Sequence, residues 1–424
     1  MFSLKVDGVY WWDIVRHDVF HLIYKTISDI PVAPGRRIAI DLGGRLRRIV
    51  GSIVLNVRVF YGGGGALFFR CARNMRDNSY VDIISDSLID LCRNDSFVID
   101  TYPYRYHIPS AIFKYADCKY TDATLGNIRE IIKNKLGVDM DLREYISSRV
   151  ATYKRERNYY LYLIKKISPK CVVVVQNGIQ KSLFAAAQEL GVPSIELQHG
   201  LINYIHPAYS YSRKINYEHI RYFPDYLLTI SDFWLKDCFY PVKNIVNVGC
   251  DSLYCVPQRI TDRSCLVATA NVYDGVLRPM LKKISGFLKD WKFIYKLHPN
   301  QYHEFSDVVE DLKPFRNVSV IANQKSIRDC LGEVSTVVAI QSTSVYESLQ
   351  AGKLVVILKE YDYNAHQDVF LNSNVRLVND AAEMMETLGN LIPGNLKEST
   401  TIFFDKFKRQ VVVDLFERLG LKTS

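Results

Sequence analysis

The sequence predicts an α/β protein made of two Rossmann-like, doubly wound domains that face each other across a cleft. Short apolar runs rich in β-branched residues, the pattern of buried strands, alternate with helical patterns along most of the chain. This alternation indicates βαβ units and parallel sheets. The 424 residues exceed what one ordinary core accommodates, and they suit two domains of roughly 200 residues each.

A domain boundary is expected where the periodic pattern fades, at residues 250–263, before strand and helix patterns restart. We therefore assign residues 1–250 to a first domain and residues 251–400 to a second. Residues 401–424 read as an amphipathic helix with basic and acidic faces, which we expect to pack back across the domains.

The elements of the first domain follow from residue type and from the residues that punctuate the pattern. The run Cys171–Val175 is too short and too β-branched for a helix, so it indicates a buried strand. Ser231 can cap a helix that starts there. Strands are expected at residues 37–41, 52–60, 171–175, 195–198, 225–230 and 245–249, and helices at residues 81–94, 124–136, 142–166, 181–190 and from 231 onward.

The second domain shows the same alternation. A helical pattern at residues 345–352 lies between two apolar runs and opens directly after the first of them. Strands are expected at residues 265–269, 293–295, 318–321, 336–340 and 355–358.

Composition limits the class of protein. The nine cysteines show neither CxxC pairs nor metal-like spacing, which indicates reduced thiols in a cytoplasmic protein. The first residues lack the layout of a signal peptide, and no run of eighteen apolar residues predicts a membrane span.

The net charge of +9 favours an anionic partner: a nucleotide, a polyanion, or the anionic cytoplasmic face of an inner membrane in peripheral contact. Basic clusters at residues 36–37, 45–48 and 154–157 also fit a solvated surface. No basic block interleaved with aromatic residues is present, so we expect no nucleic-acid partner.

Ligands of doubly wound sheets bind at the carboxyl ends of the strands, so polar residues just after strands are the candidate site residues. We expect them all to point into one cleft between the domains. In the second domain they are Thr269, Asn271, Lys296, His298, Pro299, Gln341, Ser342, Thr343 and Ser344; in the first they are Asn177, Glu196, Gln198, His199 and Gly200.

The second-domain residues suit a phosphate. His298 offers an imidazole on a loop that Pro299 fixes, and Lys296 adds charge in a direction that depends on where its strand ends. The hydroxyls of residues 342–344 and the amides of residues 344 and 345 lie at the start of a helix, where anions are stabilised. Each feature alone also fits a turn or an ordinary helix cap.

The first-domain residues suit an acid–base role. The imidazole of His199 titrates near neutral pH, and Gly200 permits a tight turn and the close approach of a substrate. Glu196 is a rival base. Strand alternation puts Glu196 and Gln198 on one face, where Glu196 equally fits a buried, paired carboxylate, so the identity of the base stays open.

These motifs resemble those of the GT-B superfamily of glycosyltransferases. Lys296-Leu297-His298-Pro299 looks like its His-Pro motif, and Ser342-Thr343-Ser344 looks like its Ser/Thr motif. Residues 192–200 resemble the segment that carries the catalytic residue, although Gln198-His199 replaces the usual acidic pattern. The resemblance covers roughly residues 170–360 and is greatest to bacterial surface-polysaccharide enzymes of the sialyltransferase, Kdo-transferase and polyol-phosphate-transferase type. It implies that Glu347 holds the ribose of the donor.

The resemblance implies a transferase that moves a sugar from a nucleotide-activated donor to a hydroxyl of a glycan or lipid-linked glycan, as in capsule, lipopolysaccharide or O-antigen synthesis. A CMP-linked acidic sugar is the favoured donor. A transferase of polyol phosphate from a CDP-linked donor, a nucleotide-sugar epimerase and a glycan-binding protein are the alternatives.

We expect no cofactor and no metal. The phosphate charge is met by side chains, and no DxD-like pair stands where a donor would bind. Asp82, Asp86 and Asp362 are expected at the surface.

Overall fold

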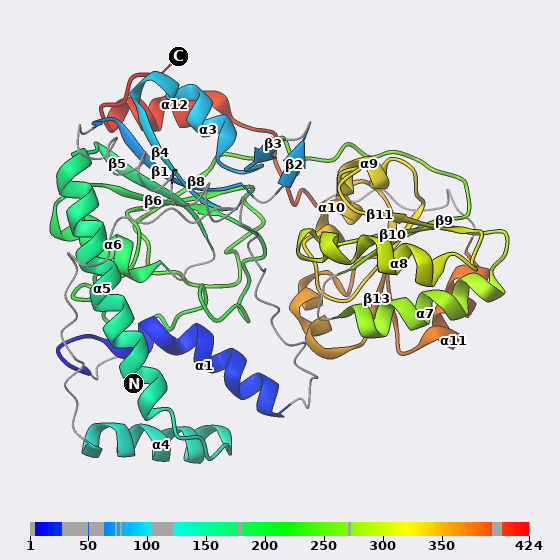
Figure 1. The fold of residues 1–424 in the computed structure, drawn as a ribbon, viewed down its shortest axis with the longest axis horizontal. Helices are drawn as coiled ribbons and strands as arrows, with labels where there is room; N and C mark the ends of the chain where they lie inside the picture. The colour runs from blue at the N-terminus through cyan, green and yellow to red at the C-terminus, as the bar shows by residue number, and fades with distance from the viewer. Residues whose placement is uncertain are drawn as a thin grey trace.

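The computed structural model confirms the predicted fold class: two six-stranded parallel sheets, each flanked by helices, form two domains that lie side by side (Figure 1). Residues 5–27, 50, 63–72, 74–76, 79–102, 122–176, 180–269, 273–391 and 401–423 are described. The strands expected at residues 37–41 and 52–60 lie outside the described residues.

The sheet of the first domain has the order β4-β1-β5-β6-β7-β8, and every neighbouring pair is parallel. Its strands are β1 (Ala66–Cys71), β4 (Ser96–Tyr102), β5 (Cys171–Gln176), β6 (Ser194–Gln198), β7 (Tyr226–Thr229) and β8 (Asn244–Asn247). A separate hairpin pairs β2 (Asn74–Arg76) with β3 (Ser79–Val81).

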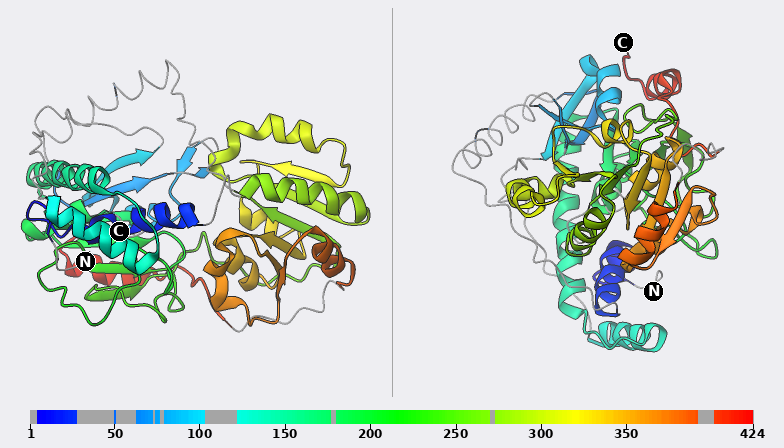
Figure 2. Two further views of the ribbon diagram at one scale, coloured as in Figure 1. Left: turned by 90° about the horizontal axis from the view of Figure 1, so that it is seen from below. Right: turned by 90° about the vertical axis from the view of Figure 1, so that its right-hand side faces the viewer.

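Helices of the first domain cover different parts of it, as Figures 1 and 2 show. They are α1 (Trp11–Ile27), α3 (Asp86–Leu91), α4 (Asp122–Leu136), α5 (Arg143–Ile167) and α6 (Lys181–Glu189). The second half of α5 packs with α6 on the sheet, and its first half joins α1 and α4 in a separate apolar cluster around Trp11, Val15 and Ile146.

The sheet of the second domain has the order β11-β10-β9-β12-β13-β14, again all parallel. Its strands are β9 (Ser264–Ala268), β10 (Lys292–Lys296), β11 (Val318–Ile321), β12 (Thr336–Ala339), β13 (Leu354–Leu358) and β14 (Val375–Val378). Its helices are α7 (Asp274–Phe287), α8 (Phe305–Leu312), α9 (Ile327–Leu331), α10 (Ser344–Gln350) and α11 (Ala381–Gly389). This is the Rossmann strand order, in which the direction of winding reverses between β9 and β12.

The chain crosses between the domains twice, and the two crossings run together. After the second domain, residues 403–408 return beside the first crossing, and α12 (Arg409–Arg418) packs on the first sheet through Val412, Leu415 and Phe416. The amide of Cys250 donates to the carbonyl of Asp405 at 2.9 Å. Gly249 has φ of +66°, and a Cβ there would lie 2.0 Å from the carbonyl oxygen of Lys406, so this close approach requires glycine.

The side chain of Gln350, the last residue of α10, ties the second domain to the returning crossing. Its Oε1 accepts the amides of Phe403 at 2.9 Å and Phe404 at 2.8 Å, and its Nε2 donates to the carbonyl of Phe404 at 2.8 Å. One buried amide group thereby satisfies three buried backbone groups that no sheet pairs.

Aromatic packing surrounds this junction. Tyr346 of α10 lies against Trp234 at a centroid separation of 5.0 Å and against Phe403 at 5.3 Å. Trp234 Nε1 and Ser231 Oγ both donate to the carbonyl of Phe403. One apolar cluster is therefore shared by the first domain, α10 and the returning crossing.

The helix expected from Ser231 is a wrong prediction. Residues 232–237 form successive turns, and Leu235 has φ of +70°, which interrupts a right-handed helix. Ser231 accepts the Phe233 amide but donates its proton to Phe403, so it ties the loop to the crossing. The final helix is also shorter than expected, since it starts at Arg409.

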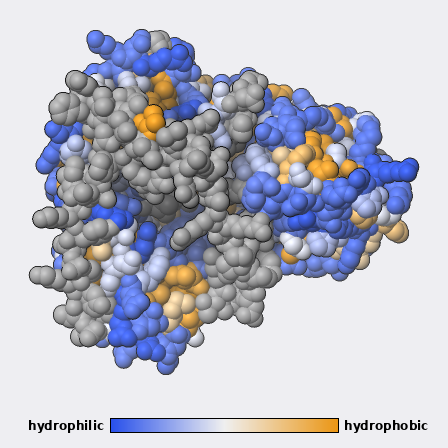
Figure 3. All heavy atoms as spheres, in the orientation of Figure 1, coloured by the Kyte–Doolittle hydropathy of each residue, from blue (hydrophilic) through white to orange (hydrophobic). Residues whose placement is uncertain are grey.

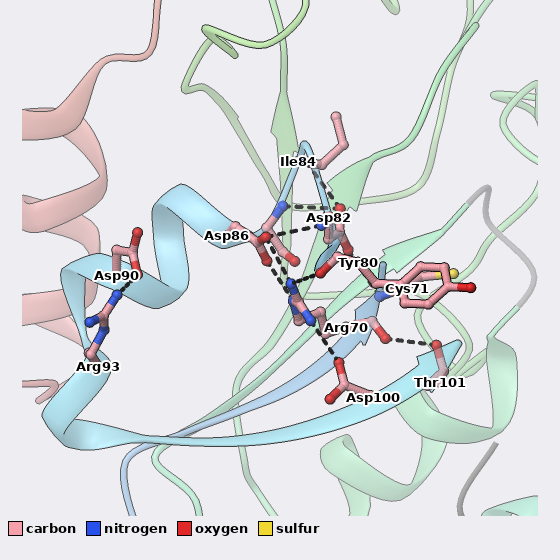
Figure 4. Close-up of polar contacts among 11 residues, drawn as sticks. Arg70, Cys71, Tyr80, Asp82, Ile84, Asp86, Asp90, Arg93, Asp100 and Thr101 are labelled. Carbon is pink, nitrogen blue, oxygen red and sulfur yellow. Dashed lines mark hydrogen bonds and ion pairs between the residues drawn. The ribbon is translucent and has the colours of Figure 1, made fainter. Parts of the chain in front are cut away.

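The predicted surface position of Asp82 is also wrong, because Asp82 is buried. Figure 4 shows the reason: its carboxylate accepts the amides of Cys71 and Ile84. It also accepts the amide of Ser85, and together these bonds shape the loop before α3. Arg70 at the end of β1 then bridges Asp86 at 2.6 Å and Asp100 at 3.0 Å. Asp86 is part-exposed, as expected, and the side chain of Asp362 lies outside the description.

The surface of the described residues carries no extended apolar face in the view of Figure 3, where apolar side chains form small separate groups. Among the described residues, no helix is both long and apolar enough to cross a membrane.

We predict that Gln350→Leu destabilises the protein by about 3 kcal/mol or more, because it leaves three buried backbone groups without partners. Chemical denaturation measures the change in the free energy of unfolding. Gln410→Leu, at an exposed position of α12, is the matched control and should change it little. Equal stability of the two variants would contradict the proposed role of Gln350.

Candidate functional site

The candidate site lies where the strand order of the second sheet reverses. The carboxyl ends of β9 and β12 flank this point, and doubly wound sheets bind ligands in the crevice outside such ends. Thr269 follows β9, and the segment Gln341–Ser344 follows β12. Strand topology and the predicted polar residues therefore coincide.

The segment Ser342–Ser344 presents hydroxyl groups. Ser342 Oγ accepts from the amide of Ser344 at 3.2 Å and from its hydroxyl at 2.8 Å. The amides of Ser344 and Val345, which the sequence offered to a phosphate, donate to the side chain and the carbonyl of Ser342. The hydroxyls are thus the donors that this segment offers to a ligand. Gln341 is held by Tyr273, which donates to its Oε1 at 2.9 Å.

The first domain meets this segment directly. A Cβ on Gly200 would lie 3.3 Å from Cγ2 of Thr343, so the backbone of the first domain passes against the hydroxyl segment of the second. Close by in sequence, Asn203 Nδ2 donates to the carbonyl of Ala365 at 2.9 Å, with both residues buried. The structure therefore brings the segment of His199 and Gly200 together with Ser342–Ser344.

His199 stands at the end of β6 as an exposed side chain. Gln198, by contrast, is fully buried; it donates to the carbonyl of Gly200 at 2.7 Å and accepts the amide of Ile230 at 3.0 Å. Gln198 thus shapes the turn that carries His199 and Gly200. Its predicted role on the acceptor side stays a prediction.

Glu196 lies on β6, two residues before Gln198, and has no exposed surface. Tyr209 donates to its Oε1 at 2.5 Å and Tyr240 to its Oε2 at 2.9 Å. Burial raises the pKa of Glu196, while these bonds and the cation of Lys181 act in the opposite direction. Of the two candidate bases, His199 alone is exposed in the structure.

A second part of this buried network lies between α1 and α6. Lys181 donates to the hydroxyl of Tyr211 at 3.2 Å, and that hydroxyl donates to Asp13 at 2.6 Å. Burial lowers the pKa of Lys181, and Asp13 and Glu196 oppose that shift. Tyr209 and Tyr211, which join these groups, are packed into the apolar core.

The segment after β10 separates into an exposed and a buried part. Lys296 is 7% exposed, and its amine donates to the carbonyls of Leu297 and Ala322. These bonds direct the amine toward the residue that follows β11. His298 is exposed at the strand end, and Pro299 begins the 3-10 helix η4 (Pro299–Glu304). Buried Gln301 of this helix accepts from the Thr269 hydroxyl at 2.7 Å, so Thr269 supports the loop of His298.

Glu347 is a buried carboxylate, one oxygen of which, Oε2, has no hydrogen-bond partner among the described residues. It is 3% exposed. Burial raises the pKa of Glu347 to about 7. A buried acid that the fold leaves unsatisfied is a candidate ligand group.

Two predicted residues lie outside the described residues: Asn271 in the second domain and Asn177 in the first. Their roles stay predictions.

Sequence reasoning missed several residues of the site. His366, in the 3-10 helix η5 (Tyr361–Val369), accepts the amide of Ser342 at 3.1 Å on Nε2. Asn203 and the two tyrosines that hold Glu196 were also missed. The sequence around His366 has no periodicity, whereas Asn203 follows His199 by four residues and belongs to the same polar segment.

No model of a known protein family matches the chain, and no curated protein matches its sequence. Solved structures do match its fold. MnaA from S. aureus with UDP has a TM-score of 0.50 at 13% identity, over 84% of this chain and 97% of that one. UDP-GlcNAc 2-epimerase from Neisseria meningitidis scores 0.48 at 12% identity, over 84% and 99%. MurG from Acinetobacter baumannii scores 0.47 at 11% identity, over 84% and 99%. At 13% identity and a TM-score of 0.50, the likeness to MnaA concerns the fold alone, which is the GT-B arrangement of two Rossmann-like domains.

We predict that Glu347→Gln stabilises the protein at alkaline pH. The folded-state pKa of about 7 exceeds the ordinary value of 4.5, so the wild type loses stability as the pH rises from about 4.5 through 7, by up to about 3 kcal/mol at pH 8. Thermal melting from pH 4.5 to pH 8 should show a variant advantage that grows with pH. The exposed Glu310→Gln is the control, and a pH-independent difference for Glu347→Gln would contradict the assignment.

Proposed function

We propose that the chain is a metal-independent glycosyltransferase that moves a sugar from a nucleotide-activated donor to a hydroxyl of a surface-glycan acceptor. The observation that carries this proposal is the contact of Gly200 with Thr343, which joins an exposed histidine of one domain to a hydroxyl-rich segment of the other. Sugar transfer from a nucleotide needs these two chemistries at one place: stabilisation of the leaving phosphate and a base for the acceptor.

The donor nucleotide binds on the second domain in this proposal. Charge develops on the phosphate as the bond to the sugar breaks, and the hydroxyls of Ser342 and Thr343 and the imidazole of His298 are the donors that would meet it. Oε2 of Glu347, which has no partner within the part of the chain that the structure describes, would accept hydrogen bonds from a ribose. Ribose hydroxyls favour the ionised acid, so nucleotide binding would release a proton near pH 7.

His199 serves as general base on the acceptor hydroxyl in this proposal. Its imidazole is exposed at the end of β6, while Glu196 has both oxygens bonded to tyrosines beneath it. Glu196 then acts on the reaction indirectly, because its hydrogen bonds with Tyr209 and Tyr240 stabilise the strand that leads into the turn of His199.

For the donor we propose a CMP-linked acidic sugar. The net charge of +9 and the resemblance of the His-Pro and Ser/Thr motifs to sialyltransferase-type enzymes support this choice. The acceptor would be a glycan or lipid-linked glycan of capsule or lipopolysaccharide type, reached from the cytoplasmic side in peripheral contact with the inner membrane. A thermal-shift screen of CMP, CDP, UDP, GDP and dTDP tests the nucleotide, and a larger shift with another nucleotide would redirect the donor.

A nucleotide-sugar epimerase is the second candidate, because the solved structures of similar fold include MnaA with UDP and UDP-GlcNAc 2-epimerases. An epimerase changes the nucleotide sugar without any acceptor, whereas a transferase requires one. Incubation of each nucleotide sugar without acceptor, followed by NMR of the sugar protons, separates the two. Transfer of a polyol phosphate from a CDP-linked donor to an acceptor would instead identify the polyol-phosphate transferase.

We predict that His199→Ala lowers kcat by about 100-fold or more, because it removes the general base. The dissociation constant of the nucleotide should change by less than about threefold, since donor binding rests on the other domain. Steady-state kinetics and calorimetry measure the two quantities. Normal turnover of His199→Ala, together with loss of activity in Glu196→Gln, would assign the base to Glu196.

We also predict that transfer continues in EDTA at an unchanged rate, because side chains meet the phosphate charge in this proposal. Transfer assays with and without added Mg²⁺ or Mn²⁺ give the measurement. Activity that EDTA abolishes and a divalent ion restores would contradict the metal-independent mechanism.

A further inference from the structure

His366 is a buried histidine to which the proposed reaction assigns no chemical role. It is 1% exposed, and its Nε2 accepts the backbone amide of Ser342 at 3.1 Å. Its ring lies edge-on to Tyr346, with centroids 5.4 Å apart. The backbone of Ser342 is thus held by a hydrogen bond to the imidazole of His366.

The protonation state of this ring follows from its contacts. An imidazole nitrogen that accepts an N–H bond carries no proton, so the neutral His366 ring carries its proton on Nδ1. A protonated ring would lose the acceptor. Burial lowers the pKa of His366 to about 3, so the acceptor persists at neutral pH.

The same helix reaches the first domain. The carbonyl of Ala365, the residue before His366, accepts from Asn203 of the loop that follows Gly200. Two residues after His366, Asp368 accepts the hydroxyl of Tyr346 at 2.8 Å. The helix η5 therefore contacts the loop of the first domain, the start of α10 and the segment Ser342–Ser344 within four residues.

We propose that His366 is a positioning residue of the donor site: by accepting the amide of Ser342 it sets the direction of the Ser342 and Ser344 hydroxyls, and through η5 it aligns them with the first domain. This inference rests on the proposed function, since that function assigns the Ser342 hydroxyl to the phosphate of the donor. The hydroxyl pair is internally arranged, with Ser344 donating to Ser342, so a rotation of Ser342 would misdirect both groups.

Three substitutions separate hydrogen bonding from packing. His366→Phe keeps a ring against Tyr346 but has no acceptor. His366→Gln carries an amide that extends to the position of Nε2, whereas His366→Asn extends only to the position of Nδ1. Gln and Asn therefore differ in reach and share their chemistry, which makes them a matched pair.

The measurement is the dissociation constant of CMP and of UDP by isothermal titration calorimetry, with thermal melting to verify that each variant is folded. We expect about tenfold weaker binding in His366→Phe and His366→Asn, the effect of one buried hydrogen bond. His366→Gln should bind within about threefold of the wild type. Nucleotide binding by His366→Phe equal to that of the wild type overturns the inference, as does equal weakening in Gln and Asn.

A double-mutant cycle with Ser342→Ala tests the route of the effect. If His366 acts by directing the Ser342 hydroxyl, adding His366→Phe to Ser342→Ala should weaken binding by less than about threefold. A full tenfold loss in the double variant would show that His366 acts elsewhere and would overturn the inference.

The ring itself gives a readout that does not need a ligand. In ¹H–¹⁵N spectra of the histidine side chains, His366 should show the Nδ1–H tautomer at neutral pH, and the Nε2–H tautomer would overturn the inference. Failure of the proposed function is distinguishable: the wild type would bind neither nucleotide, whereas failure of this inference alone leaves wild-type binding intact.

Discussion

The architecture depends on the junction where α10 meets the two crossings between the domains. Gln350 satisfies three backbone groups of the returning crossing, and Tyr346 fills the apolar space between that crossing and Trp234. Six residues before Gln350, the same short helix begins at Ser344, the last residue of the hydroxyl segment of the candidate site. The relative position of the domains and the direction of the donor groups are therefore set by one rigid element.

Buried polar groups in the two domains serve different purposes. Beneath His199, Glu196 has both oxygens bonded and a cation near it, an arrangement that fixes geometry. Behind the hydroxyl segment, Glu347 is equally buried but has an oxygen with no partner among the described residues. The first carboxylate maintains the fold, and the second retains unused hydrogen-bonding capacity that a bound molecule could satisfy.

Strand and helix periodicity allowed much of the fold to be predicted. Apolar runs such as Cys171–Val175 identified the central strands, and polar residues after them marked both halves of the candidate site. The failures have local causes. Ser231 satisfied the rule for a helix cap but bonds to a residue 172 positions away, and Asp82 looked like a surface acid because its three amide partners are fixed only by the folded loop.

His366 in the site and Gln350 at the domain junction show why other supporting residues escaped prediction. Each acts on the main chain of a distant segment, and a backbone amide leaves no signature in the sequence of either partner. Strand-end residues could be located because topology alone gathers them. Side chains that support them from behind depend on tertiary contacts.

The packing of α12 on the first sheet has a consequence for biosynthesis. Phe416 of this helix lies against Phe68 of β1, which is made hundreds of residues earlier. During translation, the apolar surface around Phe68 lacks its contact with Phe416 until the entire second domain has been synthesised. The first domain begins first and is completed last, so the order of synthesis makes the nascent chain vulnerable to aggregation until residues 409–418 arrive.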